Sequence, residues 1–140
     1  MLPLCYNHVM WLLKTSSSWA SLLPRLILAL TFVPAGWHKI SDFQSKALTW
    51  SVNFGFPTWV TGVAVFVEFF GGIALALGLL TRLAAFGILV VMSVGIWVAH
   101  LGDGYFPTYD TYGYQLCLVG LAYTLIFVGG GKFSLDKRFF

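Results

Sequence analysis

The stretch AVFVEFFGGIAL, from Ala64 to Leu75, places a single carboxylate, Glu68, inside an otherwise apolar run. What this acid does depends on the solvent around the chain, and the composition decides the solvent. Hydrophobic residues make up 59% of the 140 residues and charged residues only 9%, whereas soluble domains carry about 25% charged residues. A single domain of this length cannot hide so much apolar surface from water. The sequence therefore predicts an integral membrane protein.

Four apolar segments are long enough to cross a bilayer core, which needs about 20 helical residues, with about 17–25 tolerated. They extend over about Leu22–Ile40, Trp59–Leu80, Leu83–Leu101 and Tyr112–Gly130. Because every backbone N–H and C=O must be satisfied in lipid, each span is a helix. We predict an all-α, four-transmembrane-helix bundle over residues 22–136. An N-terminal interfacial segment at 1–21 precedes it, and a short tail at 137–140 follows.

Turn residues separate the spans, with SDFQSK and NFGFP after the first and LGDGYFPTYD after the third, and we interpret all three as loops. Positive charge then sets the orientation. Four spans place both termini on one side, and that side holds six of the eight Lys and Arg residues. The other side holds Lys39 and Lys46. This distribution predicts cytoplasmic termini in a multi-pass protein of a bacterial inner membrane.

Glu68 lies near the middle of the second span, about 14 Å from its start at 1.5 Å per residue. The i±3 and i±4 rule puts it on one face with Ala64, Gly71, Gly72 and Leu75. Small residues favour close helix contact in lipid, so this face is predicted to meet other helices. A lone charge there is costly, which predicts a protonated or hydrogen-bonded acid. Both a functional role and a purely structural role in fixing helix register remain open.

Lys39 and His38 end the first span, in which Pro34 is expected to introduce a kink. Lys39 shares a face with Gly36, and His38 lies on a different face. One interpretation of Lys39 is an anchor that extends its ammonium to the membrane surface. The other is a cation placed for an anionic or carbonyl-bearing ligand at that surface.

His100 ends the third span on a face that also carries Asp103, in the same leaflet as His38. This group could ligate a transition metal, protonate a bound quinone, or have a plain interfacial role. The spacing matches no metal motif. Cys5 and Cys117 lie on opposite sides of the predicted fold, too far apart for a disulfide, and are expected to be apolar fillers.

Arg25 and Arg82 lie at the inner boundary, where they can bind lipid phosphates or cap helix ends, and we favour this structural account of them. The chain has no nucleotide-binding glycine signature, no C-x-x-C, no HExxH and no haem site. Its basic residues are not clustered as a nucleic-acid surface requires. No self-sufficient catalytic constellation is visible, so any chemistry must come from a bound small molecule or a partner.

Three stretches together resemble the DoxX family of small four-helix membrane proteins: RLILALTFVPAGWHKI, VEFFGGIALALGLLTRLAA and GGGKFSLD. The resemblance covers roughly Leu22–Asp136. The matching positions are Arg25, Gly36, Lys39, Glu68, Gly72, Gly78, Thr81, Arg82, Gly129, Gly131, Ser134 and Asp136. It implies a compact four-helix fold and a link to respiratory, quinone or thiol redox chemistry. One departure is Tyr114-Gln115, where family members often carry a carboxylate early in the fourth helix.

Three functions follow as hypotheses. In the first, the chain is a quinone-linked subunit of a membrane oxidoreductase system. Lys39 and His38 would polarise a carbonyl, His100 would donate a proton, and Glu68 would relay protons from deeper in the membrane than the head group. In the second, the chain is an accessory scaffold that stabilises a larger membrane complex. In the third, it carries a small solute or a metal. The expected partners are membrane lipids and other membrane or redox subunits, with a homo-oligomer left open.

Overall fold

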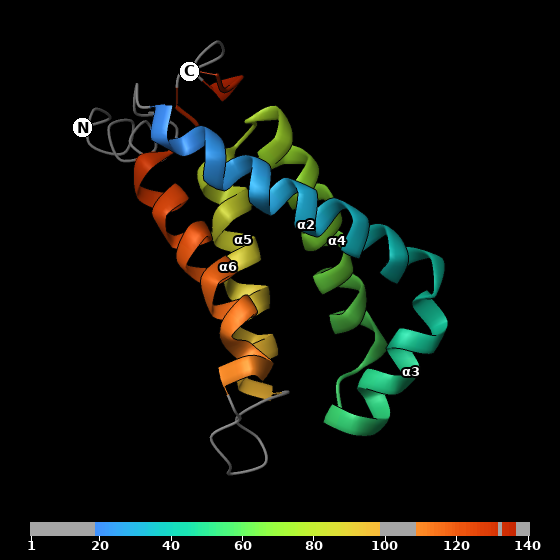
Figure 1. The fold of residues 1–140 in the computed structure, drawn as a ribbon. Coiled ribbons are helices and arrows are strands. Elements are labelled where there is room, and N and C mark those ends of the chain that lie inside the picture. Colours follow the sequence, from blue (N-terminus) through green and yellow to red (C-terminus); the bar gives the residue numbers. More distant parts are fainter. Residues whose placement is uncertain (1–18, 99–108, 132, 137–140) are drawn as a thin grey trace, which may run out of the picture.

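The computed structural model describes residues 19–98, 109–131 and 133–136. The predicted interfacial segment up to residue 18, Cys5, His100, Asp103 and the tail at 137–140 lie outside the described residues. Every regular element in the described part is helical, and Figure 1 shows their arrangement. The elements are η1 (Trp19–Ser21), α2 (Leu22–Ser41), α3 (Phe43–Phe54), α4 (Thr58–Leu77), α5 (Thr81–Ile96) and α6 (Tyr109–Val128).

Helix α3 is a correction, because we interpreted SDFQSK and NFGFP as loop. The turn residues mark the two ends of a helix. Asp42 ends α2 and precedes α3, and Gly55 ends α3 in the left-handed conformation with φ 70°. Pro57 is the N-cap of α4, and no Gly or Pro occurs in the 12 residues from Phe43 to Phe54. Breakers at both ends of a short segment are therefore consistent with a helix as well as with a loop.

Helices α2 and α4 cross in close contact, and glycine makes this contact possible. A Cβ atom on Gly36 would lie 2.7 Å from the Cβ of Phe69, and one on Gly72 would lie 3.0 Å from Cγ2 of Val33. The first distance is too short for a real side chain, and the second is tight enough that Val33 would have to shift. The small-residue face predicted around Glu68 is therefore confirmed as the face where the second apolar helix meets the first.

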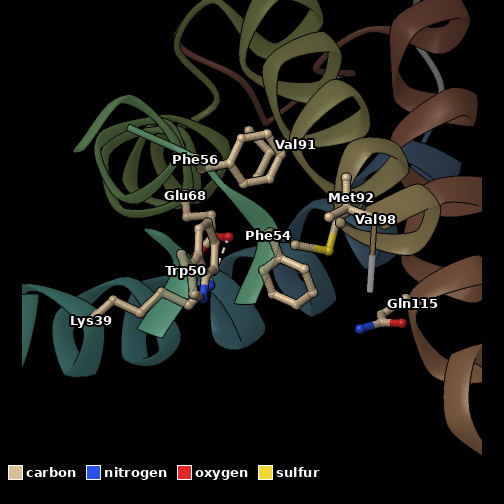
Figure 2. Close-up of a pocket in the computed structure, with 10 residues that line it drawn as sticks. Lys39, Trp50, Phe54, Phe56, Glu68, Val91, Met92, Val98 and Gln115 are labelled. Atoms are coloured by element: carbon tan, nitrogen blue, oxygen red, sulfur yellow. Dashed lines mark hydrogen bonds and ion pairs between the residues drawn. The ribbon is translucent and has the colours of Figure 1, made fainter. Parts of the chain in front are cut away.

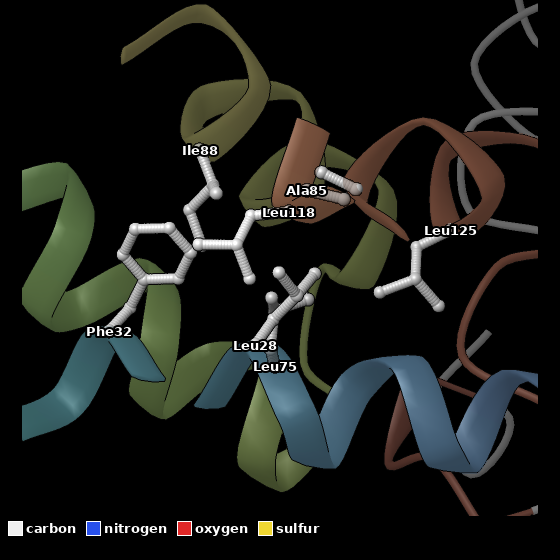
Figure 3. Packing of buried hydrophobic residues seen from close by; sticks show 8 residues of the cluster. Leu28, Phe32, Leu75, Ala85, Ile88, Leu118 and Leu125 are labelled. Atoms are coloured by element: carbon white, nitrogen blue, oxygen red, sulfur yellow. The ribbon is translucent and has the colours of Figure 1, made fainter. Parts of the chain in front are cut away.

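The apolar core lies where α2, α4, α5 and α6 converge (Figure 3). Its buried members are Leu28, Phe32, Leu75, Ala85, Ile88, Leu118, Ala122 and Leu125. Helix α3 contributes none of them. It packs against α4, where the ring of Phe43 lies 3.7 Å from the position of a Cβ on Gly62, and it continues the chain beyond the end of α2 (Figure 1). The four long helices thus form the body of the fold, with α3 beside one end.

Much of the remaining helix surface is apolar and exposed. Leu23, Leu30 and Leu83 are 67%, 75% and 65% exposed. By length and composition, two described helices can cross a membrane, namely Trp19–Ser41 and Thr58–Leu77. Shorter apolar helices extend over Thr81–Ile96 and Gly113–Val128. Outward-facing leucines on long apolar helices are suited to lipid as the surrounding solvent.

A polar clamp closes the end of the bundle opposite α3. Arg25 is 2% exposed and donates hydrogen bonds to three carbonyl oxygens, those of Leu75 (3.0 Å), Ala76 (3.3 Å) and Gly130 (2.7 Å). These carbonyls lie at or just beyond the C-terminal ends of α4 and α6, where the regular intrahelical hydrogen bonds run out. The carbonyl oxygen of Leu75 also accepts from the N–H of Gly78, at 3.2 Å. The predicted capping role of Arg25 is confirmed. Arg82 likewise donates to the carbonyl oxygen of Phe127, 3.2 Å away, near the end of α6.

The segment after α6 completes the clamp through Asp136. Its carboxylate accepts hydrogen bonds from the backbone N–H groups of Leu80 and Thr81, the latter at 2.9 Å, at the start of α5. Its own N–H donates to the carbonyl oxygen of Gly78 at 3.0 Å. A carboxylate at a helix N-terminus satisfies otherwise unpaired donors and interacts favourably with the helix dipole. The motif GGGKFSLD therefore ties the C-terminal segment to the α4–α5 turn.

Candidate functional site

Lys39 and Glu68 form an ion pair between α2 and α4. The Lys39 Nζ lies 2.8 Å from Oε1 and 2.6 Å from Oε2 of Glu68. The Glu68 side chain is 1% exposed and that of Lys39 is 24% exposed. The pair follows from the helix crossing, because Gly36 packs against Phe69 and Lys39 is three residues further along the same face of α2. An acid in the middle of α4 and a lysine near the end of α2 therefore meet.

Part of the sequence prediction for these two residues is confirmed and part is wrong. Glu68 does face its neighbouring helix and does accept hydrogen bonds from it. Lys39 does not extend outward as a surface anchor, and Glu68 is not separated from it in depth. The physical reason is the missed helix α3. It carries the chain from the end of α2 to the start of α4, so Lys39 lies level with the middle of α4.

The pair forms part of the wall of a cavity of about 180 Å³. Figure 2 shows the lining side chains, which come from five helices and the α3–α4 connection. They are Lys39, Trp50, Phe54, Phe56, Glu68, Val91, Met92, Gly95, Val98 and Gln115. A cavity of about 150 Å³ is known to accommodate benzene, so this one has room for a single six-membered ring. Aromatic and aliphatic walls with a few polar groups are typical of small-molecule sites.

Trp50 interacts with the charge as well as lining the cavity. The Lys39 Nζ lies 5.6 Å from the centroid of the Trp50 ring, within the range of a cation–π interaction. In the low-dielectric interior, the carboxylate and the ring both lower the cost of keeping an ammonium away from water. The cavity thus has a charged but electrically balanced pair on one wall and apolar surface around most of the rest.

The histidines predicted for this site are not brought to the cavity by the described structure. His38 is exposed on α2 and does not line the cavity. His100 and Asp103 lie outside the described residues, so their roles stay predictions. Among the described residues, no group of three or more His, Cys, Asp or Glu side chains is arranged to hold a metal ion. Cys117 is free and exposed, on the outer surface of α6.

The sequence interpretation missed the aromatic part of the site. Trp50 and Phe54 are four residues apart, so they share one face of a helix. That spacing was the available signal, but it has meaning only once α3 is known to be helical. Gln115 was noted only as a departure from a family pattern. The structure places it on the cavity wall, and its Oε1 has no hydrogen-bond partner among the described residues.

Comparison with known proteins identifies one family. The family model described as DoxX matches residues 20–101. The chain is 33% identical over 121 residues to an uncharacterized protein of Haemophilus influenzae, covering 83% of this chain and 87% of that protein. It is 24% identical over 116 residues to inner membrane protein YqjF of Escherichia coli, covering 83% of this chain and 88% of that protein. No solved structure matches the chain significantly.

Proposed function

The chain belongs to the DoxX family of membrane proteins, and from this premise we propose that it binds the ring of a quinone as the membrane component of a redox system. The observation that carries the proposal is the position of the Lys39–Glu68 ion pair on the wall of a ring-sized apolar cavity. A buried ion pair is weak evidence for stability, since well-packed apolar residues often serve as well or better. A pair that borders a cavity has a second use, because it can bind a polar group of a ligand.

The chemistry of the pair suits a ring carbonyl. An ammonium has three N–H donors, and the described contacts direct Lys39 toward the two oxygens of one carboxylate. A third N–H is thereby available to a carbonyl oxygen inside the cavity. Trp50, Phe54 and Phe56 supply aromatic faces for the ring, and stacked or edge-on aromatic contacts contribute about 0.5–1.5 kcal/mol each beyond burial. In this proposal Lys39 orients the ring and Glu68 holds Lys39.

An inner-membrane location with four spans and cytoplasmic termini is part of the same proposal: the distribution of Lys and Arg supports the orientation, and exposed tryptophans at both ends of the bundle support the spans. Trp59 and Trp97 are each 70% exposed at the end of the bundle where α4 begins and α5 ends, and Trp19 is 61% exposed at the opposite end. Tryptophan is enriched at both membrane interfaces. A green fluorescent protein fused to the C-terminus should fluoresce in cells, as it does in the cytoplasm. A dark but exported fusion would overturn this orientation.

The binding proposal is tested by calorimetric titration of the detergent-purified protein with a short-chain benzoquinone. Saturable binding is expected in the wild type. Lys39→Met should weaken it at least about tenfold, because a charge-assisted hydrogen bond is lost. Lys46→Met is the matched control, since Lys46 is exposed on α3 and does not line the cavity. Equal binding by wild type and Lys39→Met would leave the pair without a ligand role and favour the accessory-scaffold hypothesis.

A further inference from the structure

We propose that Gln115 anchors the far edge of the bound ring and makes the cavity accept both the oxidised and the reduced form of a quinone. The inference rests on the proposed function, because it takes the quinone ring as the occupant. Gln115 comes from α6, whereas Lys39 and Glu68 come from α2 and α4. Figure 2 shows the amide across the cavity from the ion pair, with Phe54 between them. A ring that packs against Phe54 and reaches both sides would have a polar group of the protein at each edge.

Each of these edges combines a donor with an acceptor. At the first edge, Lys39 is a donor, and the Glu68 carboxylate has about four lone-pair positions, of which the described contacts show Lys39 using two. At the second edge, a glutamine amide has an acceptor oxygen and a donor NH₂ group. A terminal amide can turn about its last bond and present either atom to the cavity. Both edges can thus donate to a carbonyl or accept from a hydroxyl.

The unpartnered oxygen of Gln115 is the observation that assigns this residue to a ligand. Oε1 is buried and has no donor among the described residues, although buried polar atoms in proteins are nearly always hydrogen-bonded. If this position served only to close the cavity, an apolar side chain would be sufficient there. The reduced ring, with a hydroxyl at each of two opposite edges, supplies the missing donor, and toward a carbonyl of the oxidised ring the amide presents its NH₂ group instead. The oxidised ring has two carbonyl acceptors and the reduced ring has two hydroxyl donors, so each form makes one hydrogen bond at each edge.

The consequence is similar affinity for the two forms. Because each form makes the same number of hydrogen bonds, and one such bond changes affinity by about two- to tenfold, the two dissociation constants should agree within about threefold. Gln115→Leu should weaken both forms, by about two- to tenfold each. Gln115→Glu keeps the acceptors and, when ionised, loses the donor. It should therefore weaken the oxidised form more than the reduced form.

The experiment is an anaerobic titration of the full-length protein with a short-chain benzoquinone and, separately, with its chemically reduced quinol. Wild type, Gln115→Leu, Gln115→Glu and Cys117→Ala are compared, and Cys117 is the control because it is exposed on the same helix. Thermal unfolding verifies that each variant is folded. The ratio of the wild-type dissociation constants for the quinone and the quinol tests the proposal even if a variant does not fold.

The outcomes separate this inference from the proposed function. A wild-type preference of more than about tenfold for one form, equivalent to one unmatched hydrogen bond, would overturn the inference. Unchanged binding of both forms in folded Gln115→Leu would also overturn it. In either case quinone binding itself would stand. A folded wild-type protein that binds neither form would overturn the proposed function and this inference together.

Discussion

Two cations on α2, the buried Arg25 and the partly buried Lys39, differ in what surrounds them. Arg25 is fixed at one end of the helix by three backbone carbonyl oxygens. Lys39, near the other end, is paired with a single side chain next to a cavity. Backbone carbonyls at helix ends cannot be removed by mutation, so the clamp around Arg25 is part of the fold. The partner of Lys39 can be removed, and its cavity can take a ligand. The difference separates a charge used for folding from a charge available for binding.

The largest expected effect is at the clamp. Arg25→Met removes the described donor to the carbonyl oxygens of Ala76 and Gly130 and one of the two described donors to that of Leu75, and each unsatisfied buried group costs about 1–3 kcal/mol. Since native domains are stable by only about 5–15 kcal/mol, we expect little or no folded protein. The measurement is the monodisperse yield and thermal unfolding temperature in detergent. A variant that purifies in wild-type yield with an unchanged unfolding temperature would refute the structural role of Arg25.

The second effect, somewhat smaller, concerns the other half of the clamp. Asp136→Ala removes the carboxylate that accepts from Leu80 and Thr81. Loss of a side chain that caps a helix N-terminus costs about 0.5–2 kcal/mol. We expect a measurably lower unfolding temperature with quinone binding retained, because the clamp lies at the opposite end of the bundle from α3. Asp42→Ala, which removes an exposed acid, is the control and should melt close to the wild type.

The third effect, whose size overlaps that of the second, is a loss of stability at the ion pair. Lys39→Met removes the ion-pair partner of Glu68, but the carboxyl group can take up a proton and so avoid a buried charge. The cost should be about 1–3 kcal/mol, that of one unsatisfied buried group, and less than that of Arg25→Met. The monodisperse yields of the two variants, with the thermal unfolding temperature of whatever folds, measure the difference. An equal loss of stability in Lys39→Met and Arg25→Met would contradict the different roles assigned to the two cations.

Sequence reasoning predicted the parts of this fold that depend on local pattern. The boundaries of α2 and α4, and the inward face of Glu68, follow from apolar length and from small residues at helical spacing. Capping of helix ends was one of the two structural roles predicted for Arg25. The site was only partly predicted, because the depth of Lys39 depends on how α2 crosses α4, which is a property of tertiary packing. Trp50 and Phe54 were missed because Asp42, Gly55 and Pro57 suggested a loop.

The most direct measurement uses the double variant Lys39→Met/Glu68→Leu, which removes both charges together. Thermal unfolding and benzoquinone titration are carried out on the same preparation. Because apolar pairs commonly replace buried ion pairs without loss of stability, the variant should unfold at or above the wild-type temperature. Its affinity for the ring should fall at least about tenfold, the loss of the charge-assisted hydrogen bond from Lys39. A double variant that unfolds as easily as Arg25→Met, or that binds the ring as well as the wild type, would contradict a binding role for this pair.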